Sequence, residues 1–291
     1  MKKVLFRVFL FFGVLTFVAL GCLGYAYFIE PHRLTIEETD LRIPHWSRKL
    51  DGFKVVAISD IHGGSNGVDE ARLEELVKSA NAQNPDLIVL LGDFVSQVGR
   101  GNSDLRMPVE TIADMISGLR AKYGVYGVIG NHDWWYNEQK VTEALESRGI
   151  RVLENRIEEI KVNGEILSLW GIEDNWKHRT VPTAGTFDRI SKKENIIALT
   201  HNPDSLLKAP GGISIMFAGH RHGGQIKFPI FGAYPWVNDG RFMEKEAVVD
   251  GKHVFVTTGV GVSGPQLRFL VPPEIAVVSL FSEQEGVSRG Q

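Results

Sequence analysis

The chain has 291 residues, of which 43% are hydrophobic and 23% are charged, and its formal net charge is −3 at pH 7. This is the composition of a globular protein with enough apolar material for a sizeable core. Proteins that bind nucleic acid by neutralising phosphates usually carry a basic surface, so the acidic balance argues against that class of partner. Cys22 is the only cysteine, which excludes a disulfide within the chain.

The N-terminal residues predict a membrane anchor. Lys2, Lys3 and Arg7 precede residues 8–29, a run of 22 residues without a charged side chain. Such a run can span the hydrocarbon core of a bilayer, and the apolar region of a cleavable signal peptide is usually shorter. We therefore expect residues 1–29 to form an uncleaved single-pass anchor in the cell membrane. The basic tail favours an extracytoplasmic domain, although basic residues between positions 33 and 49 count the other way under the same rule.

The rest of the chain alternates between helical and strand-like patterns. Residues 30–50 are mixed polar and predict a tether or an edge strand, and residues 51–285 predict one domain. Asp250-Gly251 predicts a hairpin turn. Apolar residues at helical spacing predict three helices, at 69–83, 109–121 and 138–148. The whole pattern predicts an α/β fold with a two-sheet β core and helices packed outside it.

Five short polar segments follow apolar runs that predict buried strands. They are Asp60-Ile61-His62, Gly92-Asp93, Gly130-Asn131-His132-Asp133, His201 and His220-Arg221-His222. The carboxyl ends of parallel strands meet at one edge of a sheet, where α/β proteins place their sites. Alternate residues of an extended strand point to the same face, so Asp60 and His62 are expected to reach one metal ion, and His220 and His222 are expected to lie side by side. Oxygen and nitrogen donors without cysteine suit Mn²⁺, Fe or Zn²⁺ and argue against a closed structural zinc site.

Each segment is a weak signal when it is taken alone. A single Asp-x-His or Gly-Asp is more often a surface turn, and a single histidine after a strand is more often a satisfied polar residue than a ligand. The joint pattern is more specific, because five of the nine histidines fall in these segments and each segment follows a predicted strand. The set therefore predicts one site rather than five coincidences.

Taken together, the segments resemble the calcineurin-like metallophosphoesterases, whose pattern is Asp-x-His, Gly-Asp, Gly-Asn-His-Asp/Glu, His and Gly-His-x-His in that order. The resemblance implies a four-layer α/β/β/α sandwich and two divalent metal ions, with Mn²⁺ as the first choice and Fe or Zn²⁺ as alternatives. It implies one ion held by Asp60, His62, Asp93 and His222. It implies a second ion held by Asp93, Asn131, His201 and His220, so that Asp93 bridges the pair.

Other residues are candidates for catalytic and binding roles, and the role of His132 is the one that the resemblance implies. His132 is expected to protonate the leaving oxygen or to stabilise the transition state. Asp133 is expected either to hold the ring of His132 or to cap the loop in which it lies. Arg221 and Arg268 are candidate contacts for a substrate phosphate or head group, with a solvated surface position as the alternative for each.

The segment 219–225 further resembles membrane-associated relatives that include UDP-2,3-diacylglucosamine pyrophosphatase-like enzymes of lipid A biosynthesis. We therefore expect a membrane-anchored two-metal hydrolase that cleaves a phosphodiester or pyrophosphate bond in a phosphorylated small molecule or a lipid. The alternatives are a general phosphodiesterase of the cell envelope, a cyclic-nucleotide phosphodiesterase or nuclease, and an inactive scaffold. Apolar residues at 134–136 and 228–236 are expected either to contact acyl chains or the membrane, or to pack over the core. The sequence carries no signal for the oligomeric state.

Overall fold

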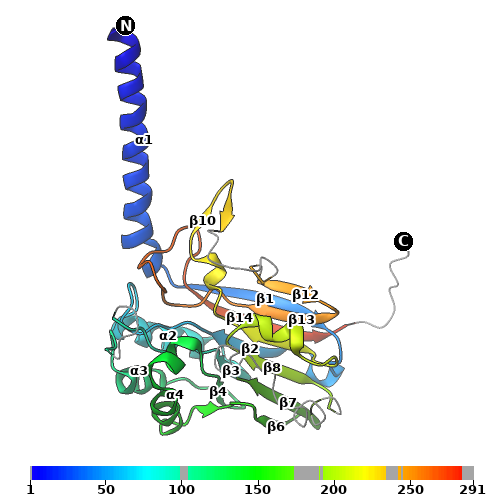
Figure 1. The fold of residues 1–291 in the computed structure, drawn as a ribbon. Coiled ribbons are helices and arrows are strands. Elements are labelled where there is room, and N and C mark those ends of the chain that lie inside the picture. Colours follow the sequence, from blue (N-terminus) through cyan, green and yellow to red (C-terminus); the bar gives the residue numbers. More distant parts are fainter. Residues whose placement is uncertain are drawn as a thin grey trace, which may run out of the picture.

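Two six-stranded sheets stack face to face in the computed structural model, which describes residues 2–98, 104–173, 190, 193–233, 242–243 and 245–283 (Figure 1). The first sheet has the order β1 (Thr35–Ile43), β14 (Glu274–Ser282), β2 (Phe53–Ile58), β3 (Leu87–Leu90), β4 (Val125–Gly127) and β5 (Arg151–Val152). Strands β2 to β5 run parallel, and β14 is antiparallel to β2. The carboxyl ends of β2, β3 and β4 therefore share one edge.

The second sheet repeats this arrangement with a parallel centre. Its order is β12 (Glu246–Val249), β13 (Lys252–Val256), β9 (Ile215–Ala218), β8 (Ile196–Thr200), β7 (Glu165–Ile172) and β6 (Ile157–Val162). Strands β13, β9, β8 and β7 are parallel, and the two outer pairs are antiparallel. The predicted hairpin turn at Asp250-Gly251 is confirmed: it joins β12 to β13 with both residues at positive φ, as a tight two-residue hairpin requires.

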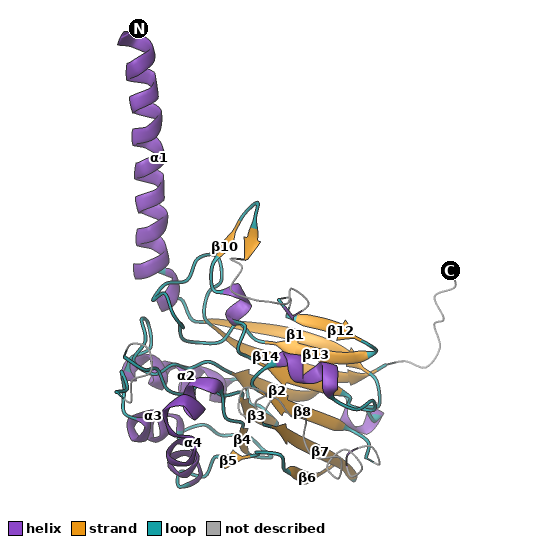
Figure 2. Ribbon diagram, viewed as in Figure 1, coloured by secondary structure: helices purple, strands orange, loops and turns teal. Residues whose placement is uncertain are grey.

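Strand alternation divides the apolar side chains between the layers. In β2, Val55 and Ala57 pack between the two sheets, whereas Val56 and Ile58 face the helices that cover the first sheet. Those helices are α2 (Glu70–Ala82), α3 (Val109–Ile116) and α4 (Asn131–Glu146) (Figure 2). Because both faces of the central strands are covered, their sequences are continuously apolar rather than alternating.

The predicted two-sheet β core with outer helices is confirmed. On the outer face of the second sheet, the described residues contribute the 3₁₀ helix η3 (Pro203–Lys208) and a third apolar cluster that includes Trp170, Met216 and Phe242. Helix α2 lies where it was predicted, and α3 ends five residues earlier than predicted (Ile116 instead of residue 121). Helix α4 is kinked at Asn137, so the helix predicted from residue 138 is its second segment, and a first segment from Asn131 precedes it. The early start of α4 puts the Asn131-His132-Asp133 segment into its first turn.

Of the two alternatives predicted for residues 30–50, the edge strand is confirmed and the tether is wrong for most of the segment. Thr35–Ile43 form β1, which pairs in parallel with β14 along its full length and is an edge strand of the first sheet. Two short 3₁₀ helices, η1 (Glu30–His32) and η2 (Arg48–Leu50), flank it. The folded domain therefore begins before residue 51. Helix α1 (Lys2–Phe28) extends away from the domain, and its length and composition are sufficient for it to cross a membrane (Figure 1).

Candidate metal centre

The seven expected metal ligands converge at the carboxyl ends of the strands of both sheets. Asp60 and His62 follow β2, Asp93 follows β3, and Asn131 follows β4 at the start of α4. His201 follows β8, and His220 and His222 follow β9. All seven are buried or nearly so. The parallel topology explains the convergence, because it directs the end of each strand to the same side of the sandwich.

The ligands do not sit on extended strands, so the predicted alternation of Asp60 with His62 and of His220 with His222 is wrong in its geometry. Strand β2 ends at Ile58, and the residues after it run beside the segment that follows β3 in irregular backbone. Five ligands have φ between 44° and 68°, in the left-handed region: Asp60, His62, Asp93, His220 and His222. Asp and His tolerate this region better than most residues, but it is still a strained conformation that surrounding structure must impose. Backbone hydrogen bonds supply that constraint, with the N–H of Asp60 donating to Gly92 and that of His62 to Asp93, both at 2.9 Å.

Asp60, His62 and His222 form the first ligand group. His222 Nε2 lies 3.3 Å from Asp60 Oδ1 and 3.3 Å from His62 Nε2. His62 Nε2 lies 3.6 Å from Asp93 Oδ2. The four side chains thus direct one donor atom each towards a common point.

Asp93, Asn131, His201 and His220 form the second group. His201 Nε2 lies 3.1 Å from Asn131 Oδ1, 3.0 Å from His220 Nδ1 and 3.3 Å from Asp93 Oδ2. The same oxygen, Asp93 Oδ2, therefore stands beside a histidine of each group. That position is the one a carboxylate needs in order to bridge two cations.

The donor geometry fits divalent cations. Ligand atoms about 2.1 Å from one cation lie roughly 3.0–3.5 Å from each other, which is the spacing within each group. Asp60 Oδ1 is buried without a hydrogen-bond partner, although Asp60 Oδ2 accepts the N–H of His220 at 3.0 Å. A buried carboxylate oxygen without a donor is costly unless a cation satisfies it. The residues present therefore fit a pair of metal ions.

Backbone carbonyls hold two of the imidazoles in the tautomer that a metal requires. His62 Nδ1 donates to the carbonyl of Val95 at 3.1 Å, and His201 Nδ1 donates to that of Leu91 at 2.8 Å. A carbonyl can only accept, so the proton is on Nδ1 and the lone pair on Nε2 faces the site. The hydrogen bond at Nδ1 thus fixes both the orientation and the charge of each ring.

Burial sets the protonation of the site. It lowers the pKa of His62 and of His220 to about 3, and it lowers that of His222 as well, so these rings are neutral ligands at neutral pH. Burial raises the pKa of Asp60 to about 6. Burial also acts to raise the pKa of Asp93, but His201 and His132 outweigh it and hold that pKa well below the usual range. The proposed bridging carboxylate is therefore ionised across the physiological range.

His132 is positioned by Gln97 and not by Asp133. Its Nδ1 donates to Gln97 Oε1 at 2.7 Å, and Gln97 Nε2 donates to the backbone carbonyl of His132 at 2.6 Å. The backbone N–H of His132 donates to Asp93 Oδ1 at 2.7 Å, and its Nε2 meets Ser263 Oγ at 3.2 Å. The ring is therefore fixed beside the ligand groups with Nε2 turned away from its amide clamp. Gln97 and Ser263 are two site residues that the sequence analysis missed.

Asp133 instead holds the backbone of the site together. Its Oδ1 accepts the N–H groups of Phe94 and Val95, and its Oδ2 accepts the N–H of Gly130 at 3.0 Å, which caps α4. Burial raises the pKa of Asp133 to about 7 and nearby Asp93 acts in the same direction, against the lowering effect of these donors. The expectation that Asp133 holds the ring of His132 is wrong, and the alternative of a capping carboxylate describes it.

The two candidate substrate arginines differ from each other. Arg221 is mostly buried and pairs with Asp204 at 2.6 Å, while its Nε has no hydrogen-bond partner. Arg268 is fully buried, and its guanidinium donates to the backbone carbonyls of Thr258, Gly259, Gly261 and Val271. Arg268 is therefore a structural residue, and its expected contact with a substrate is wrong because its donors already bind backbone.

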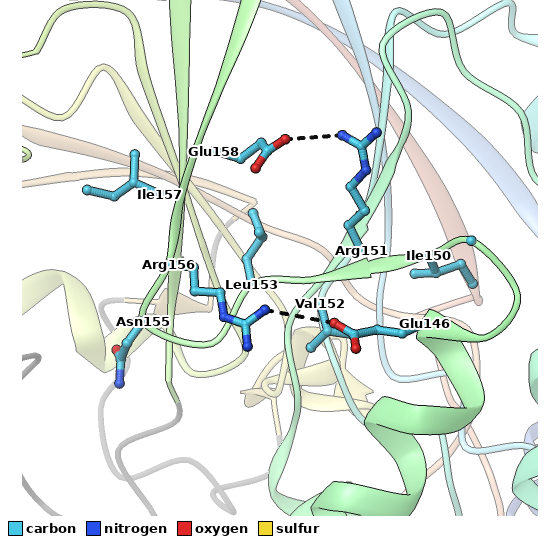
Figure 3. A pocket seen from close by; sticks show the side chains of 10 residues that line it. Glu146, Ile150, Arg151, Val152, Leu153, Asn155, Arg156, Ile157 and Glu158 are labelled. Carbon is cyan, nitrogen blue, oxygen red and sulfur yellow. Dashed lines mark hydrogen bonds and ion pairs between the residues drawn. The ribbon is translucent and has the colours of Figure 1, made fainter.

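A separate cavity of about 650 Å³ lies between the edge strands β5 and β6 (Figure 3). The ion pairs Arg151–Glu158 and Arg156–Glu146 line it, at 3.2 Å and 4.0 Å. None of the seven expected metal ligands is among its lining residues. This cavity is therefore separate from the candidate metal centre at the strand ends.

Comparisons with known proteins agree with the site. A sequence model of the calcineurin-like phosphoesterases matches residues 53–224, the segment that contains all seven ligands. The chain is 31% identical to the uncharacterized metallophosphoesterase YkuE of Bacillus subtilis over 97% of this chain and 99% of that protein. It is 28% identical to phosphodiesterase YaeI of Escherichia coli over 88% and 92% of the two chains.

A third relative carries a membrane term in its name. The chain is 28% identical to a zebrafish transmembrane protein with metallophosphoesterase domain, over 84% of this chain and 57% of that protein. The family match spans more than half of the chain, and the relationship to YkuE spans nearly all of it. The chain belongs to the calcineurin-like phosphoesterases and is a metal-dependent phosphoester hydrolase.

Proposed function

We propose that this protein is a membrane-anchored hydrolase that cleaves a phosphodiester or pyrophosphate bond in a lipid-linked substrate. The observation that carries the proposal is the pair of ligand groups that share Asp93 Oδ2, with His132 fixed beside them. One group is Asp60, His62 and His222, and the other is Asn131, His201 and His220. Two divalent ions, with Mn²⁺ preferred, complete the site.

The residues around the ions divide the work. When bound, the two ions would supply positive charge to the phosphate oxygens and would lower the pKa of water at the site. His132 would donate a proton to the leaving oxygen from Nε2 of its doubly protonated ring and become neutral, keeping the Nδ1–H that donates to Gln97. The hydroxyl of Ser263 can accept a hydrogen bond from Nε2 of the charged ring and donate one to Nε2 of the neutral ring. Arg221 lies between two ligands in sequence and contributes positive charge to the phosphate side of the site, steadied by Asp204.

The anchor and the neighbouring aromatic residues support a lipid-linked substrate. Helix α1 is apolar and unburied along nearly its whole length. Trp134 and Trp135 are exposed next to His132, and the ring of Trp135 lies 4.8 Å from that of His132. The other apolar segment noted in the sequence, 228–236, is described only as far as residue 233. We name UDP-2,3-diacylglucosamine, a precursor in lipid A biosynthesis, as one candidate substrate.

The side of the membrane separates the lipid candidates. The basic tail of Lys2, Lys3 and Arg7 favours an extracytoplasmic catalytic domain, which suits phosphodiesters of the cell envelope. A UDP-linked lipid precursor requires a domain that faces the cytoplasm. Protease protection of the domain in sealed membrane vesicles distinguishes the two.

The activity test uses the full-length protein in detergent with Mn²⁺. The panel contains a chromogenic phosphodiester, UDP-2,3-diacylglucosamine, a glycerophospholipid, cyclic AMP and single-stranded DNA. Asp93→Asn, which keeps the shape of the side chain, is expected to lose at least about a thousandfold in kcat because it removes the shared charge. The matched control is Asp250→Asn in the β12–β13 turn, where Asn tolerates the positive φ. Preferential turnover of cyclic AMP or DNA, or full activity in Asp93→Asn, would overturn the proposal.

A further inference from the structure

A short β-hairpin carries the most exposed large apolar side chains that the structure describes outside α1. The hairpin consists of β10 (Lys227–Phe228) and β11 (Gly232–Ala233), and the turn between them exposes 87% of Ile230 and 85% of Phe231. A two-stranded hairpin of this length gains little stability of its own. Two large apolar side chains left in water forgo the stabilisation that their burial would give. Exposed apolar side chains of this kind indicate a surface that contacts an apolar partner.

The hairpin is fixed next to the C-terminal end of α1. The ring of Phe269 lies 6.3 Å from that of Tyr25 in α1 and 6.2 Å from that of Phe228 in β10. The N–H of Arg268 donates to the carbonyl of Ala26 at 3.0 Å, and the N–H of Lys227 donates to that of Phe269 at 2.8 Å. Residues 268–269 thus join the helix to the hairpin. Figure 1 shows both rising from the same side of the domain and in the same direction.

The exposed apolar residues near this junction form one surface, which we call the apolar tip: Phe228, Ile230, Phe231 and Leu270. Leu270 has a φ of 57°, an unusual conformation for a leucine, and about half of its side chain is exposed. Strain that leaves an apolar side chain in solvent has no benefit to a protein in water. It is consistent with a residue that faces lipid.

The depth of the apolar tip follows from the length of α1. The uncharged run of residues 8–29 is about 33 Å long as a helix, close to the roughly 30 Å hydrocarbon core of a bilayer. If α1 spans that core, Tyr25 and Tyr27 lie near its edge, where tyrosine side chains are favoured. Ala26 contacts the domain, so the domain reaches the membrane surface and the hairpin projects beyond it towards the lipid.

We infer that the apolar tip inserts into the same lipid leaflet as the C-terminal end of α1 and forms a second membrane contact of the domain. The occupant of this surface is the acyl region just below the head groups. The argument rests on continuity with α1: an apolar helix of spanning length leaves the domain at this place and is bonded to the loop that supports the hairpin. One anchor lets a domain rotate and tilt, whereas two contacts fix its orientation.

The orientation of the domain on the membrane affects the metal centre because the hairpin follows one of the proposed ligands closely in the chain. The 3₁₀ helix η4 (His222–Gly224) contains a proposed ligand and is followed at once by the hairpin. Gln225 Nε2 donates to the carbonyls of Ser263 and Pro265, at 3.1 Å and 2.9 Å, and Ser263 contacts His132. Insertion of the tip therefore sets the height of the site above the leaflet. Resting on the proposed function, this deepens it: the scissile phosphate belongs to the head group of a lipid in that leaflet.

A fluorescence measurement tests the insertion without any assay of activity. The full-length protein carries Cys22→Ser and Ile230→Cys, is labelled with nitrobenzoxadiazole, and is reconstituted into vesicles of phosphatidylcholine and phosphatidylglycerol. We expect a blue-shifted emission that lipids spin-labelled near the head group quench strongly. The matched control is Val248→Cys in the same background, at an exposed apolar position on the edge strand β12, and it should remain unquenched.

Two outcomes of this measurement contradict the insertion. Emission at position 230 that is neither blue-shifted nor quenched, as at position 248, means that the tip stays in water. A blue shift at position 230 that spin-labelled lipids do not quench means that protein covers the tip, either a second copy or another part of this chain.

A kinetic measurement connects the tip to the substrate. The double variant Ile230→Asp/Phe231→Asp is expected to lose at least about tenfold in turnover of a phospholipid diester in vesicles, and to keep its turnover of a soluble chromogenic diester. Val248→Asp should change neither. An equal loss on both substrates would mean that the tip supports the fold of the site, which contradicts a membrane role. If the wild type hydrolyses neither substrate, the proposed function fails, and the quenching result alone decides the insertion.

Discussion

Gln97 holds His132, the proposed general acid, through an uncharged amide, and we call this pair of contacts the clamp. A single side chain accepts from the ring of His132 and donates to the backbone of the same residue. This fixes the ring plane and the tautomer with one amide. A carboxylate in the same place would also hold the ring, but it would add negative charge beside the phosphate.

The clamp predicts a specific kinetic effect. Gln97→Ala should lower kcat by about tenfold to a hundredfold with little change in KM, because the ring is needed in the transition state and not for binding. Gln97→Glu should restore much of kcat and move the alkaline limb of the pH–rate profile to higher pH, since a carboxylate favours the charged ring. The control is Gln139→Ala on the exposed face of α4. A lower kcat with an unchanged profile in Gln97→Glu would reduce Gln97 to a packing role.

The buried position of Arg268 predicts that its substitution lowers the stability of the fold and does not act on substrate binding. Its guanidinium donates to several backbone carbonyls of the loop 258–271, and it is fully buried. Arg268→Ala leaves those carbonyls without donors and should reduce the free energy of unfolding by about 3 kcal/mol or more in urea denaturation. Arg151→Ala, which breaks an exposed pair, should cost about 1 kcal/mol or less. A raised KM with unchanged stability in Arg268→Ala would indicate that this residue contacts the substrate.

Among the elements, the ends of β2 and β9 show why the ligands come so close. These two strands belong to different sheets, and the loops that follow them touch at Gly219. A Cβ at this position would lie 1.8 Å from Ser59 Oγ and 2.6 Å from Asp60 Oδ2. Only a residue without a side chain allows the backbone before His220 to approach Asp60 and donate to it.

The contact predicts that Gly219→Ala separates the two loops. The substitution should reduce the bound metal and lower the activity by at least about a hundredfold, because a displacement of the order of 1 Å breaks the ligand geometry. Gly211→Ala is the matched control, since a Cβ there meets nothing within 4 Å. Metal analysis by mass spectrometry and the chromogenic assay measure both effects. Normal metal content in Gly219→Ala would show that the close approach is dispensable.

The sequence predicted elements best where the signal is local. The apolar runs of β2, β3, β4, β8 and β9 and the spacing of α2 are properties of a few adjacent residues. The extent of α4 was underpredicted because its first turn consists of polar site residues, which resemble a loop. Residues 30–50 could be assigned only to a tether or an edge strand, because the pairing of β1 with β14 joins residues about 240 apart, a separation that no local pattern reports.

The residues of the candidate site also divide into those that local sequence can predict and those that only the fold reveals. The ligands could be named from sequence because Asp, Asn and His after buried strands are chemically unusual. Gln97 and Ser263 could not, since each is an ordinary loop residue that matters only through its contact with His132. The role of Asp133 depended on three backbone donors from two segments, which only the folded chain brings together.

For the whole molecule, the buried histidines predict how stability depends on pH. In the metal-free protein, the pKa values of His62 and His220 are lowered from 6.5 to about 3. Below pH 6.5 the unfolded chain therefore binds protons that the folded chain does not, and each histidine lowers the stability by roughly 1.4 kcal/mol per pH unit. Asp60 and Asp133 act oppositely, because their raised pKa values of about 6 and about 7 let the folded chain bind protons that the unfolded chain releases above pH 3.8. Three buried histidines with lowered pKa values, His222 included, outweigh these two aspartates.

We therefore expect the Tm of protein treated with a chelator to fall as the pH is lowered from 6.5 to 4.5. The double variant His62→Asn/His220→Asn should not show this fall, because His222 alone no longer outweighs Asp60 and Asp133. With Mn²⁺ present, the Tm at neutral pH should rise, and acidification should cost more because protons also displace the metal. A metal-free Tm that is constant or rises on acidification would contradict neutral buried histidines in the folded site.

The most direct measurement of the central claim is anomalous diffraction from crystals of the full chain grown with Mn²⁺. The account predicts two anomalous peaks per chain, one among Asp60, His62 and His222 and the other among Asn131, His201 and His220. Both peaks should lie within bonding distance of Asp93 Oδ2. A single peak, or two peaks that do not share Asp93, would contradict a two-metal site built on one bridging carboxylate.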